Sequence, residues 1–282
     1  PVPTVAQELL IEEVIVTATR RSESIQDIPI NITALNSETI ERDRLTDLAD
    51  IARVVPGMTV IDQGPRGSNT LTVRGLKLND MDRVEVLMGP QGTLYGAGTM
   101  GGAVRYIPNR PQLDGLSYEL RGDVYALSHS DDAGYEGGGT LNIPIIADKL
   151  ALRASVDYLD DPGFIDYNYL VQQAGVSNPQ PWSGRAALRY SEDWFDGTLS
   201  YYYQDQDIGA RQINHRDAFG TGRYEAAHRF LEPNKRKNEL YALEMVFDLG
   251  FADLTSATGY SEYTERGSRD QTDLLLTFEY GY

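Results

Sequence analysis

Three glycines within VEVLMGPQGTLYGAGTMGGAVRYIPNRP, residues 84–111, have the spacing of a dinucleotide-binding loop. Gly96, Gly98 and Gly101 give G-x-G-x-x-G, which binds a pyrophosphate when the first glycine directly follows a strand and a helix begins at the last. Here the β-branched run RVEVLM ends near Met88, well before Gly96, and GAVRYIPNRP has no helical spacing. No Gly-Lys-Ser/Thr follows, which excludes a P-loop. These glycines therefore predict tight turns and close backbone contacts.

Other residue types that perform chemistry are sparse. The chain has no cysteine, which excludes disulfides, thiolate metal sites and a cysteine nucleophile. The acidic pairs Asp131-Asp132 and Asp160-Asp161 could bind calcium, but such pairs beside Gly or Pro usually mark solvated turns. The three histidines fall in expected loops and share no face that could hold a metal: His129, His215 and His228. No set of nucleophile, base and orienting group is present, so we predict neither an enzyme nor a resident cofactor.

The charge balance narrows the choice of partner. Asp and Glu number 42 against 25 Lys and Arg, a formal net charge of −17. Such a chain repels phosphates, so nucleic acid is not an expected partner. No run of about 18 apolar residues exists that could form a transmembrane helix. The chain begins with Pro1 and has no basic-then-apolar leader, so we expect that it is processed, trimmed or incomplete.

The first 112 residues predict a small α+β domain. Residues 1–11 have no clear pattern, and Glu12–Ala18 is a β-branched run suited to a strand. Residues 37–55 have helical spacing, with Ser37 as the expected cap, a second short helix starting near Thr46, and Pro56-Gly57 as the stop. Three further segments predict strands: MTVIDQ, TLTVRG and RVEVLM.

From residue 116 onward the pattern changes to strands alone. In LSYELRGDVYAL and KLALRASVDYL, apolar and polar residues alternate with period two. About eight such segments have roughly the ten-residue length of tilted membrane strands. Short links alternate with long polar ones at 160–181 and 206–237, and aromatic residues gather at the short turns. The alternation favours a transmembrane antiparallel β-barrel over a soluble β-sandwich, whose strands are usually shorter.

Taken together, these segments resemble TonB-dependent outer-membrane receptors of Gram-negative bacteria. VEVLMGPQGTLYGAGTMGGAVRYIPNRP is similar to the end of their plug domain, and EEVIVTATRR to their N-terminal energy-coupling box. The resemblance implies a mainly β fold, with a flexible N-terminus and TonB box at 1–19, a plug inside the lumen at 20–112, and an N-terminal portion of the barrel at 113–282. The chain departs from the family pattern in two ways. The family usually has a further stretch between VRGL and RVEVL, whereas here only KLND joins Leu76 to Met81. In addition, about eight strands cannot surround a plug. We therefore expect a piece of a longer receptor.

The resemblance also implies a function. A scarce solute, most often a ferric siderophore, binds outside and is imported with energy supplied through TonB and its inner-membrane complex. Outer-membrane lipid and lipopolysaccharide are implied as surroundings. Cobalamin, heme, oligosaccharides and aromatic compounds remain open as cargo. A passive porin or adhesin is a competing class, as is a soluble β-rich enzyme or carbohydrate-binding domain.

Site residues follow from the same resemblance. The expected TonB contact is the segment that could add a strand to a partner sheet: Glu13, Val14, Ile15, Val16, Thr17 and Ala18. The alternative is an ordinary first strand of the plug. The expected ligand contacts at the plug apex are Arg66, Gln91 and Tyr95, with solvated turns as the alternative. Inside the lumen, we expect the plug arginines Arg74 and Arg83 to pair with carboxylates of the wall: Glu119, Asp123 and Asp157.

Overall fold

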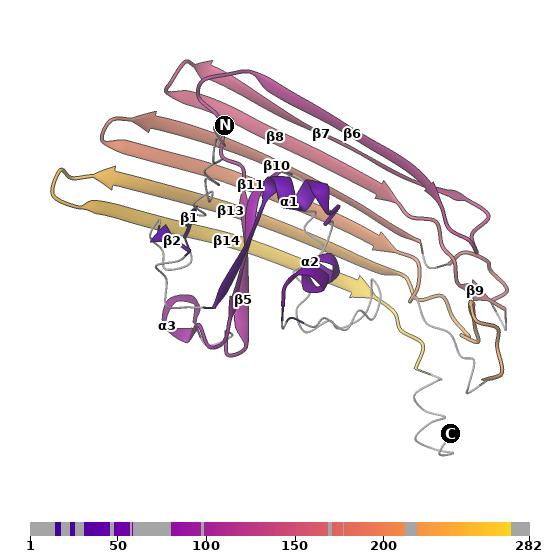
Figure 1. Ribbon diagram of the computed structural model, residues 1–282. Coiled ribbons are helices and arrows are strands. Elements are labelled where there is room, and N and C mark those ends of the chain that lie inside the picture. Colours follow the sequence, from indigo (N-terminus) through magenta and orange to yellow (C-terminus); the bar gives the residue numbers. More distant parts are fainter. Residues whose placement is uncertain are drawn as a thin grey trace, which may run out of the picture.

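The computed structural model shows a small α+β domain lying against one face of a long antiparallel sheet (Figure 1). We call these two parts the plug and the wall. The structure describes residues 15–17, 23–25, 31–45, 48–56, 58, 80–96, 99–168, 171–176, 178–211 and 219–271. Within these ranges, no helix has both the length and the hydropathy needed to cross a membrane.

The wall is a meander in which each strand pairs with the next along the chain. Its strands are β6 (Ser117–Ala126), β7 (Ala133–Ile146), β8 (Leu150–Asp160), β10 (Pro179–Glu192), β11 (Phe195–Ile208), β13 (Asn234–Asp248) and β14 (Asp253–Gly267). These strands have 10 to 15 residues each, as membrane-crossing strands require. The described part of the sheet thus has seven strands, where the sequence pattern suggested about eight.

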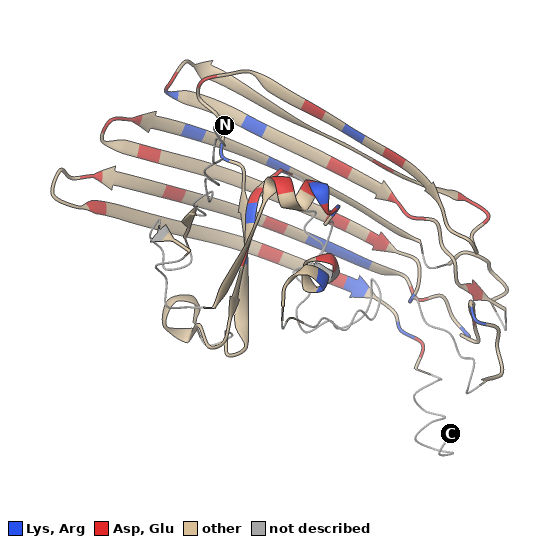
Figure 2. Ribbon diagram, viewed as in Figure 1, with Lys and Arg blue, Asp and Glu red and all other residues tan. Residues whose placement is uncertain are grey.

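The two faces of the wall differ in polarity, as the alternation predicts. On β6, Leu120 and Val124 project away from the plug and remain 83% and 74% exposed. Charged residues recur along the wall strands (Figure 2), and the face that meets the plug does so through Arg153 and Arg185. An apolar outer face with a polar inner face is the arrangement of a barrel that lies in lipid.

The connections confirm the predicted rhythm of short and long links. Short turns follow β7, β10 and β13, whereas 161–178 and 209–233 are long. At the short turns, the ring of Phe195 lies 5.0 Å from that of Phe247 and 5.6 Å from that of Trp194. Phe251 at the neighbouring turn is 87% exposed. Aromatic side chains therefore gather at this end of the wall, as in an interfacial belt.

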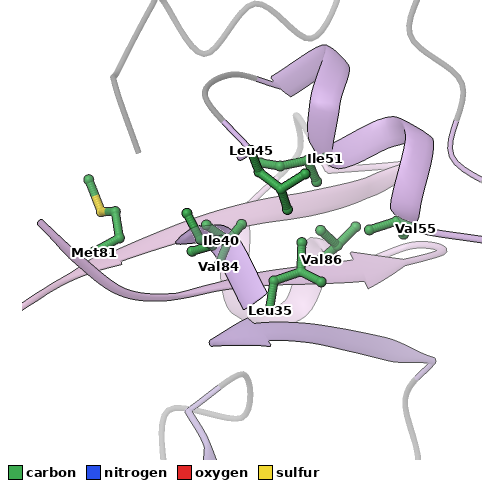
Figure 3. Packing of buried hydrophobic residues seen from close by; sticks show 8 residues of the cluster. All are labelled: Leu35, Ile40, Leu45, Ile51, Val55, Met81, Val84 and Val86. Carbon is green, nitrogen blue, oxygen red and sulfur yellow. The ribbon is translucent and has the colours of Figure 1, made fainter. Parts of the chain in front are cut away.

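The plug is built on the three-stranded sheet β3-β4-β5 with two helices packed on it. Its elements are β1 (Ile15–Val16), β2 (Glu23–Ser24), β3 (Ile32–Asn36), α1 (Ser37–Arg42), α2 (Leu48–Val54), β4 (Met81–Met88), α3 (Gly92–Tyr95) and β5 (Gly102–Pro108). Figure 3 shows the core between helices and sheet, formed by Leu35, Ile40, Leu45, Ile51, Val55, Met81, Val84 and Val86. Full burial of each such aliphatic side chain contributes about 1.5–3 kcal/mol.

The helical prediction for residues 37–55 needs one correction, at its cap, and the second short helix predicted near Thr46 is found as α2. The cap is Asn36, whose Oδ1 accepts a hydrogen bond from the Thr39 N–H at 2.9 Å, and Ser37 is instead the first helical residue. The helix ends at Arg42, and Arg44 has φ 49°, so the chain leaves the helical region before α2 begins. The strand RVEVLM is confirmed within β4. The strand predicted at TLTVRG lies outside the described residues, as does all of MTVIDQ except Met58.

The long links fold together at the end of the wall opposite the short turns. Strand β9 (Asp166–Tyr167) from the first link pairs in parallel with β12 (Glu225–Ala226) from the second. A separate small apolar core holds them: Ile165, Tyr167, Val176, Ala210 and Ala226, with Phe164, Val171 and Tyr224 packed against it. The described parts of these two links therefore share an apolar interior of their own.

Candidate functional site: the plug, its N-terminal segment and the wall

The N-terminal segment is docked on the plug through its backbone. Ile15 and Val16 pair with Ser24 and Glu23, and the side chain of Val16 is fully buried. The next residue, Thr17, donates its backbone N–H to Glu85 Oε1 at 2.9 Å. A backbone contact of this kind places few demands on side-chain type.

Glu85 is a fully buried carboxylate at the centre of this docking point. Arg83 Nε donates to its Oε1 at 2.9 Å, and Arg105, its cross-strand neighbour on β5, contacts Oε2. Both guanidinium groups also approach the Thr17 hydroxyl. A buried carboxylate is tolerated only when it is paired and hydrogen-bonded. The two arginines thus pair with Glu85 at the point where it accepts the Thr17 N–H.

A second buried carboxylate, Asp80, fastens the plug to the wall. Its side chain is 1% exposed, and its Oδ1 accepts from Arg153 Nε of β8 at 2.7 Å. Arg185 of β10 reaches Oδ2 at 3.2 Å and the Asn109 carbonyl oxygen at 2.8 Å. Asn109 Nδ2 donates back to Asp80 Oδ1 at 3.1 Å. One carboxylate and one carbonyl, side by side at the same end of the β4–β5 pair, therefore hold two wall arginines.

The connection from the plug to the first wall strand is fixed in the same way. Asn142 of β7, which is fully buried, accepts the Gln112 N–H at 2.8 Å. Its Nδ2 donates to the carbonyl oxygens of Gln112 and Gly115 at 3.0 and 2.8 Å. Beside it, Arg110 pairs with Asp196 of β11 at 2.6 Å. We call this row of contacts, from Asp80 to Asn142, the seam.

The glycine-rich segment lies between β4 and β5 and makes turns, as predicted. Gly89, Gly96 and Gly102 have φ of 88°, 85° and 143°, which L side chains rarely adopt. Gly101 has open space around it, and Gly98 lies outside the described residues. A strand, β5, follows the motif. A strand in place of a helix after Gly101 argues against the dinucleotide interpretation, because that site needs a helix N-terminus at the last glycine.

The two described residues predicted to contact ligand lie on this segment. The Gln91 side chain is 8% exposed, and its backbone carbonyl accepts the Tyr95 N–H at 3.0 Å. The Tyr95 ring is partly buried, with the Arg105 guanidinium 5.6 Å from its centre. Arg105 therefore links this turn to Glu85 and the N-terminal segment. The predicted residues Arg66, Arg74, Glu13, Val14 and Ala18 lie outside the described residues.

The predicted pairing of plug arginines with wall carboxylates is wrong for Arg83, and Arg74 lies outside the described residues. Arg83 pairs with Asp82 and Glu85 of its own strand. On the wall, Glu119 and Asp157 both pair with Arg121, at 2.7 and 3.0 Å. Residues i and i+2 of a strand share one face, which explains the pairs Arg83–Glu85 and Glu119–Arg121. Asp157 of β8 instead reaches Arg121 of β6 across the wall. At Asp80 the polarity is reversed, with the carboxylate on the plug and the arginines on the wall.

Sequence reasoning missed the residues that make the seam. The alternation in KLALRASVDYL puts Arg153 on the polar face of its strand. No pattern in the sequence connects Arg153 with its partner Asp80, which lies 73 positions away. Of the two acidic pairs, Asp160-Asp161 accepts from tyrosines: Asp161 takes the Tyr125 hydroxyl and Asp160 the Tyr135 hydroxyl, each at 2.6 Å. Among the described residues, no group of three or more His, Asp or Glu side chains has the geometry of a metal site.

Known proteins share both parts of this architecture. Residues 24–80 match the family model of the TonB-dependent Receptor Plug Domain. The chain is 24% identical over 234 residues to the vitamin B12 transporter BtuB of Vibrio vulnificus, a match covering 70% of the chain and 37% of the transporter. It is 27% identical over 127 residues to a hemin receptor of Yersinia enterocolitica, covering 36% of the chain and 18% of the receptor.

The fold is also that of a solved receptor. The pyoverdine outer membrane receptor FpvA of Pseudomonas aeruginosa PAO1, bound to pyoverdine, matches with a TM-score of 0.70 at 17% identity, covering 88% of this chain and 40% of that one. The resemblance to TonB-dependent receptors is thereby confirmed, as is the fold of a plug against part of a barrel wall. The chain spans about two fifths of this receptor and a smaller share of both curated relatives.

Proposed function

We propose that this chain, which has the plug sequence and the wall fold of TonB-dependent receptors, belongs to an importer in the outer membrane of a Gram-negative bacterium and is not an enzyme. The observation that carries the proposal is the seam. A small domain is held by buried polar contacts to the inner face of a wall whose outer face is apolar. A passive pore has no need of such a domain, and a soluble sandwich would not expose the outer face.

The proposed parts of the chain are those that the resemblance implies. Residues 1–19 carry the coupling box, 20–112 form the plug, and 113–282 are the N-terminal portion of the barrel, surrounded by outer-membrane lipid and lipopolysaccharide. Support for the second boundary comes from Asn142, which ties Gln112 and Gly115 to the wall where the plug ends. Support for the first comes from Thr17, the residue through which the N-terminal segment reaches Glu85.

The proposed partner of the N-terminal segment is TonB, which pairs with Glu13–Ala18 as an added strand. In this role Ile15 and Val16 exchange their present partners in β2 for a strand of TonB, and Thr17 leaves Glu85. The exchange conserves backbone hydrogen bonds, so its net free energy is small compared with the bonds broken. Arg83 and Arg105 keep Glu85 paired after Thr17 has left. The docking point thus survives each cycle.

Replacing Ile15 by proline tests the proposed function. Proline removes the backbone N–H at position 15, so the segment cannot pair fully with TonB as an added strand. Import is therefore expected to cease while solute still binds to the receptor. The measurement is growth of a receptor-deletion strain that carries the full-length receptor, with iron supplied only as a ferric siderophore, together with siderophore binding to whole cells. Ile15→Ala, which keeps the N–H, is the matched control and should grow. Normal growth of Ile15→Pro would remove the segment from the coupling mechanism.

The proposed cargo is a ferric siderophore, which contacts the plug at Arg66, Gln91 and Tyr95. Support comes from the solved pyoverdine receptor, whereas the curated relatives include a vitamin B12 transporter and a hemin receptor. Cobalamin and heme are therefore the alternatives, and oligosaccharides or aromatic compounds follow. Supplying each compound in turn to the same deletion strain distinguishes them, because only the true cargo makes growth depend on the receptor.

Tyr95→Ala is expected to weaken solute affinity about tenfold, or about 1.4 kcal/mol, the upper range of a single aromatic contact. Equilibrium binding of labelled solute to outer membranes measures this loss. Tyr95→Phe keeps the ring and its position near Arg105, so it should retain most of the affinity. Leu94→Ala, on the same short helix, controls for damage to α3. Equal affinities in all three variants would place the ligand elsewhere.

A further inference from the structure

The outer face of the wall carries an ordered series of side chains toward the long-link ends of β11, β13 and β14. Residues directly opposite each other on neighbouring strands share a face, so the register places these side chains in rows. They alternate with rows such as that of Tyr202 and Leu240, which shares the plug-facing side with Arg185. From the middle of the strands toward the long links, the outer rows are Tyr201, Tyr241 and Tyr260; Tyr203, Glu239 and Glu262; Asp205, Lys237 and Thr264; and Asp207, Lys235 and Arg266.

Aromatic rings mark where the apolar part of this face ends. The Tyr201 ring lies 4.7 Å from that of Tyr241, which lies 6.4 Å from that of Tyr260. The line of rings continues toward β10 through Tyr203 and Trp182, whose centres are 4.5 Å apart. Such amphipathic rings lie at the boundary between hydrocarbon and headgroups. The charged rows therefore begin where the headgroups of the outer leaflet begin.

The positive charges beyond this boundary project further than their negative partners. Lys and Arg residues gather at the long-link ends of β13 and β14 (Figure 2). Lys235 Nζ lies 2.6 Å from Asp207, and Lys237 Nζ lies 3.0 Å from Glu239. In both pairs the lysine side chain is the more exposed, at 70% against 44% and at 48% against 22%. Exposed pairs of this kind contribute little stability, so both ammonium groups remain accessible to an anion from outside.

The outermost row places two positive charges side by side. Lys235 and Arg266 are directly opposite each other on β13 and β14, and the described residues of this row include one carboxylate, Asp207. Like charges in this position repel each other and destabilise the strand pair. A phosphate between them would replace repulsion by attraction, since Lys and Arg both donate charge-assisted hydrogen bonds to phosphate oxygens. Lys237, whose Nζ lies 5.2 Å from the centre of the Tyr203 ring, extends this positive edge to the aromatic boundary.

We propose that Lys235, Lys237 and Arg266 bind the phosphates of lipopolysaccharide, the phosphorylated glycolipid of the outer leaflet. Asp207, beside Lys235, lies four residues beyond Tyr203, or about 13 Å along the strand and less along the membrane normal because membrane strands are tilted. Long cationic side chains at this height reach the headgroups. A dissolved anion is repelled by a chain of net charge −17, whereas a phosphate anchored in the membrane is held beside the site. The inference rests on the proposed function only in placing the wall in an outer membrane.

The test is the affinity of the full-length receptor, purified in detergent, for fluorescent diphosphoryl lipid A, the phosphorylated anchor of lipopolysaccharide. EDTA is present, so that divalent cations cannot bridge carboxylates to phosphates. Lys235→Gln and Arg266→Gln are each expected to weaken binding about tenfold, the range of one hydrogen bond to a charged group. Lys149→Gln is the matched control, because Lys149 also pairs with a surface carboxylate, Glu192 at 2.7 Å, but at the short-turn end. It should bind as the wild type does.

Asp207→Asn separates phosphate binding from a merely structural ion pair. It removes the carboxylate that competes with phosphate for Lys235, so affinity should rise about two- to fivefold, the range of an exposed pair. A pair that only supports the strands would give no rise. Dephosphorylated lipid A and phosphatidylglycerol are the competitors that identify the source of the phosphate, and neither should displace the probe at equal concentration.

Three results overturn the site: wild-type affinity in both glutamine variants, an equal loss in Lys149→Gln, or displacement of the probe by either competitor as effective as that by unlabelled diphosphoryl lipid A. Import is followed separately by the same growth assay as for Ile15→Pro, in which Lys235→Gln should grow as the wild type does. A wild-type receptor that bound lipid A through these residues but supported no growth would contradict the import proposal and leave the phosphate site standing.

Discussion

Asp80→Asn is expected to lower the free energy of unfolding of the β4–β5 pair by about 3–5 kcal/mol, the cost of breaking a buried ion pair from one side. The reason is that Arg153 and Arg185, with side chains 11% and 7% exposed, would keep their charges without the carboxylate. Asparagine has nearly the same shape, so the loss reports charge and not volume. Hydrogen exchange of the β4 and β5 amides in the full-length receptor, followed by mass spectrometry, measures it.

The control for Asp80 is Asp43→Asn. Asp43 also pairs with an arginine, Arg42, but that pair lies on the surface of α1. Exposed pairs contribute little because water solvates both ions when they part. Asp43→Asn should therefore leave exchange unchanged. If Asp80→Asn also left the β4 and β5 amides as well protected as in the wild type, the seam would not be what holds the plug to the wall.

Gly102→Ala is expected to destabilise the same strand pair by about 3 kcal/mol or more, because it combines a clash with backbone strain. An added Cβ at Gly102 would lie 2.4 Å from the Leu87 carbonyl oxygen, and its φ of 143° is a conformation that glycine alone adopts readily. The backbone of β4 cannot move away without breaking its pairing with β3. Loss of amide protection across β4 is the readout.

The neighbouring glycine provides a matched comparison. Gly101 has no atom within 4 Å of an added Cβ and no positive φ. The Gly101→Ala variant should therefore fold as the wild type does. This substitution changes the G-x-G-x-x-G pattern, whereas Gly102→Ala leaves the pattern intact. Equal damage from the two substitutions would mean that the segment depends on glycine for flexibility and not for this single close approach.

The wall was predictable because its signal is repeated along each strand. Period-two alternation in segments such as KLALRASVDYL fixes which side chains face lipid, and the strands from β6 to β14 follow it. The plug core was partly predictable in the same way. Leu45 and Ile51 recur at helical spacing and do pack together, yet the helix breaks between them at Arg44. Helical spacing identifies the buried side chains, but it does not reveal that one residue between them, Arg44, has a left-handed backbone conformation.

The contacts of the site were not predictable from the same sequence. Asp80 and Arg153 meet because a plug strand end happens to face β8, and a charge carries no mark of its distant partner. Arg83 has two carboxylates within two residues, Asp82 and Glu85, and it pairs with them and not with carboxylates of the wall. His228 lies in a link without periodicity, so its burial between Glu232 and Asp270 follows only from how three segments fold together.

For the proposed import function, the seam has a consequence for the route of the cargo. Its contacts reach the strands from β7 to β11, through Asn142, Arg153, Arg185 and Asp196. In the proposed importer, a plug that kept these contacts would rotate about this line. The gap would then widen on the side away from β8 and β10. Cargo would pass along strands that bear none of these arginines.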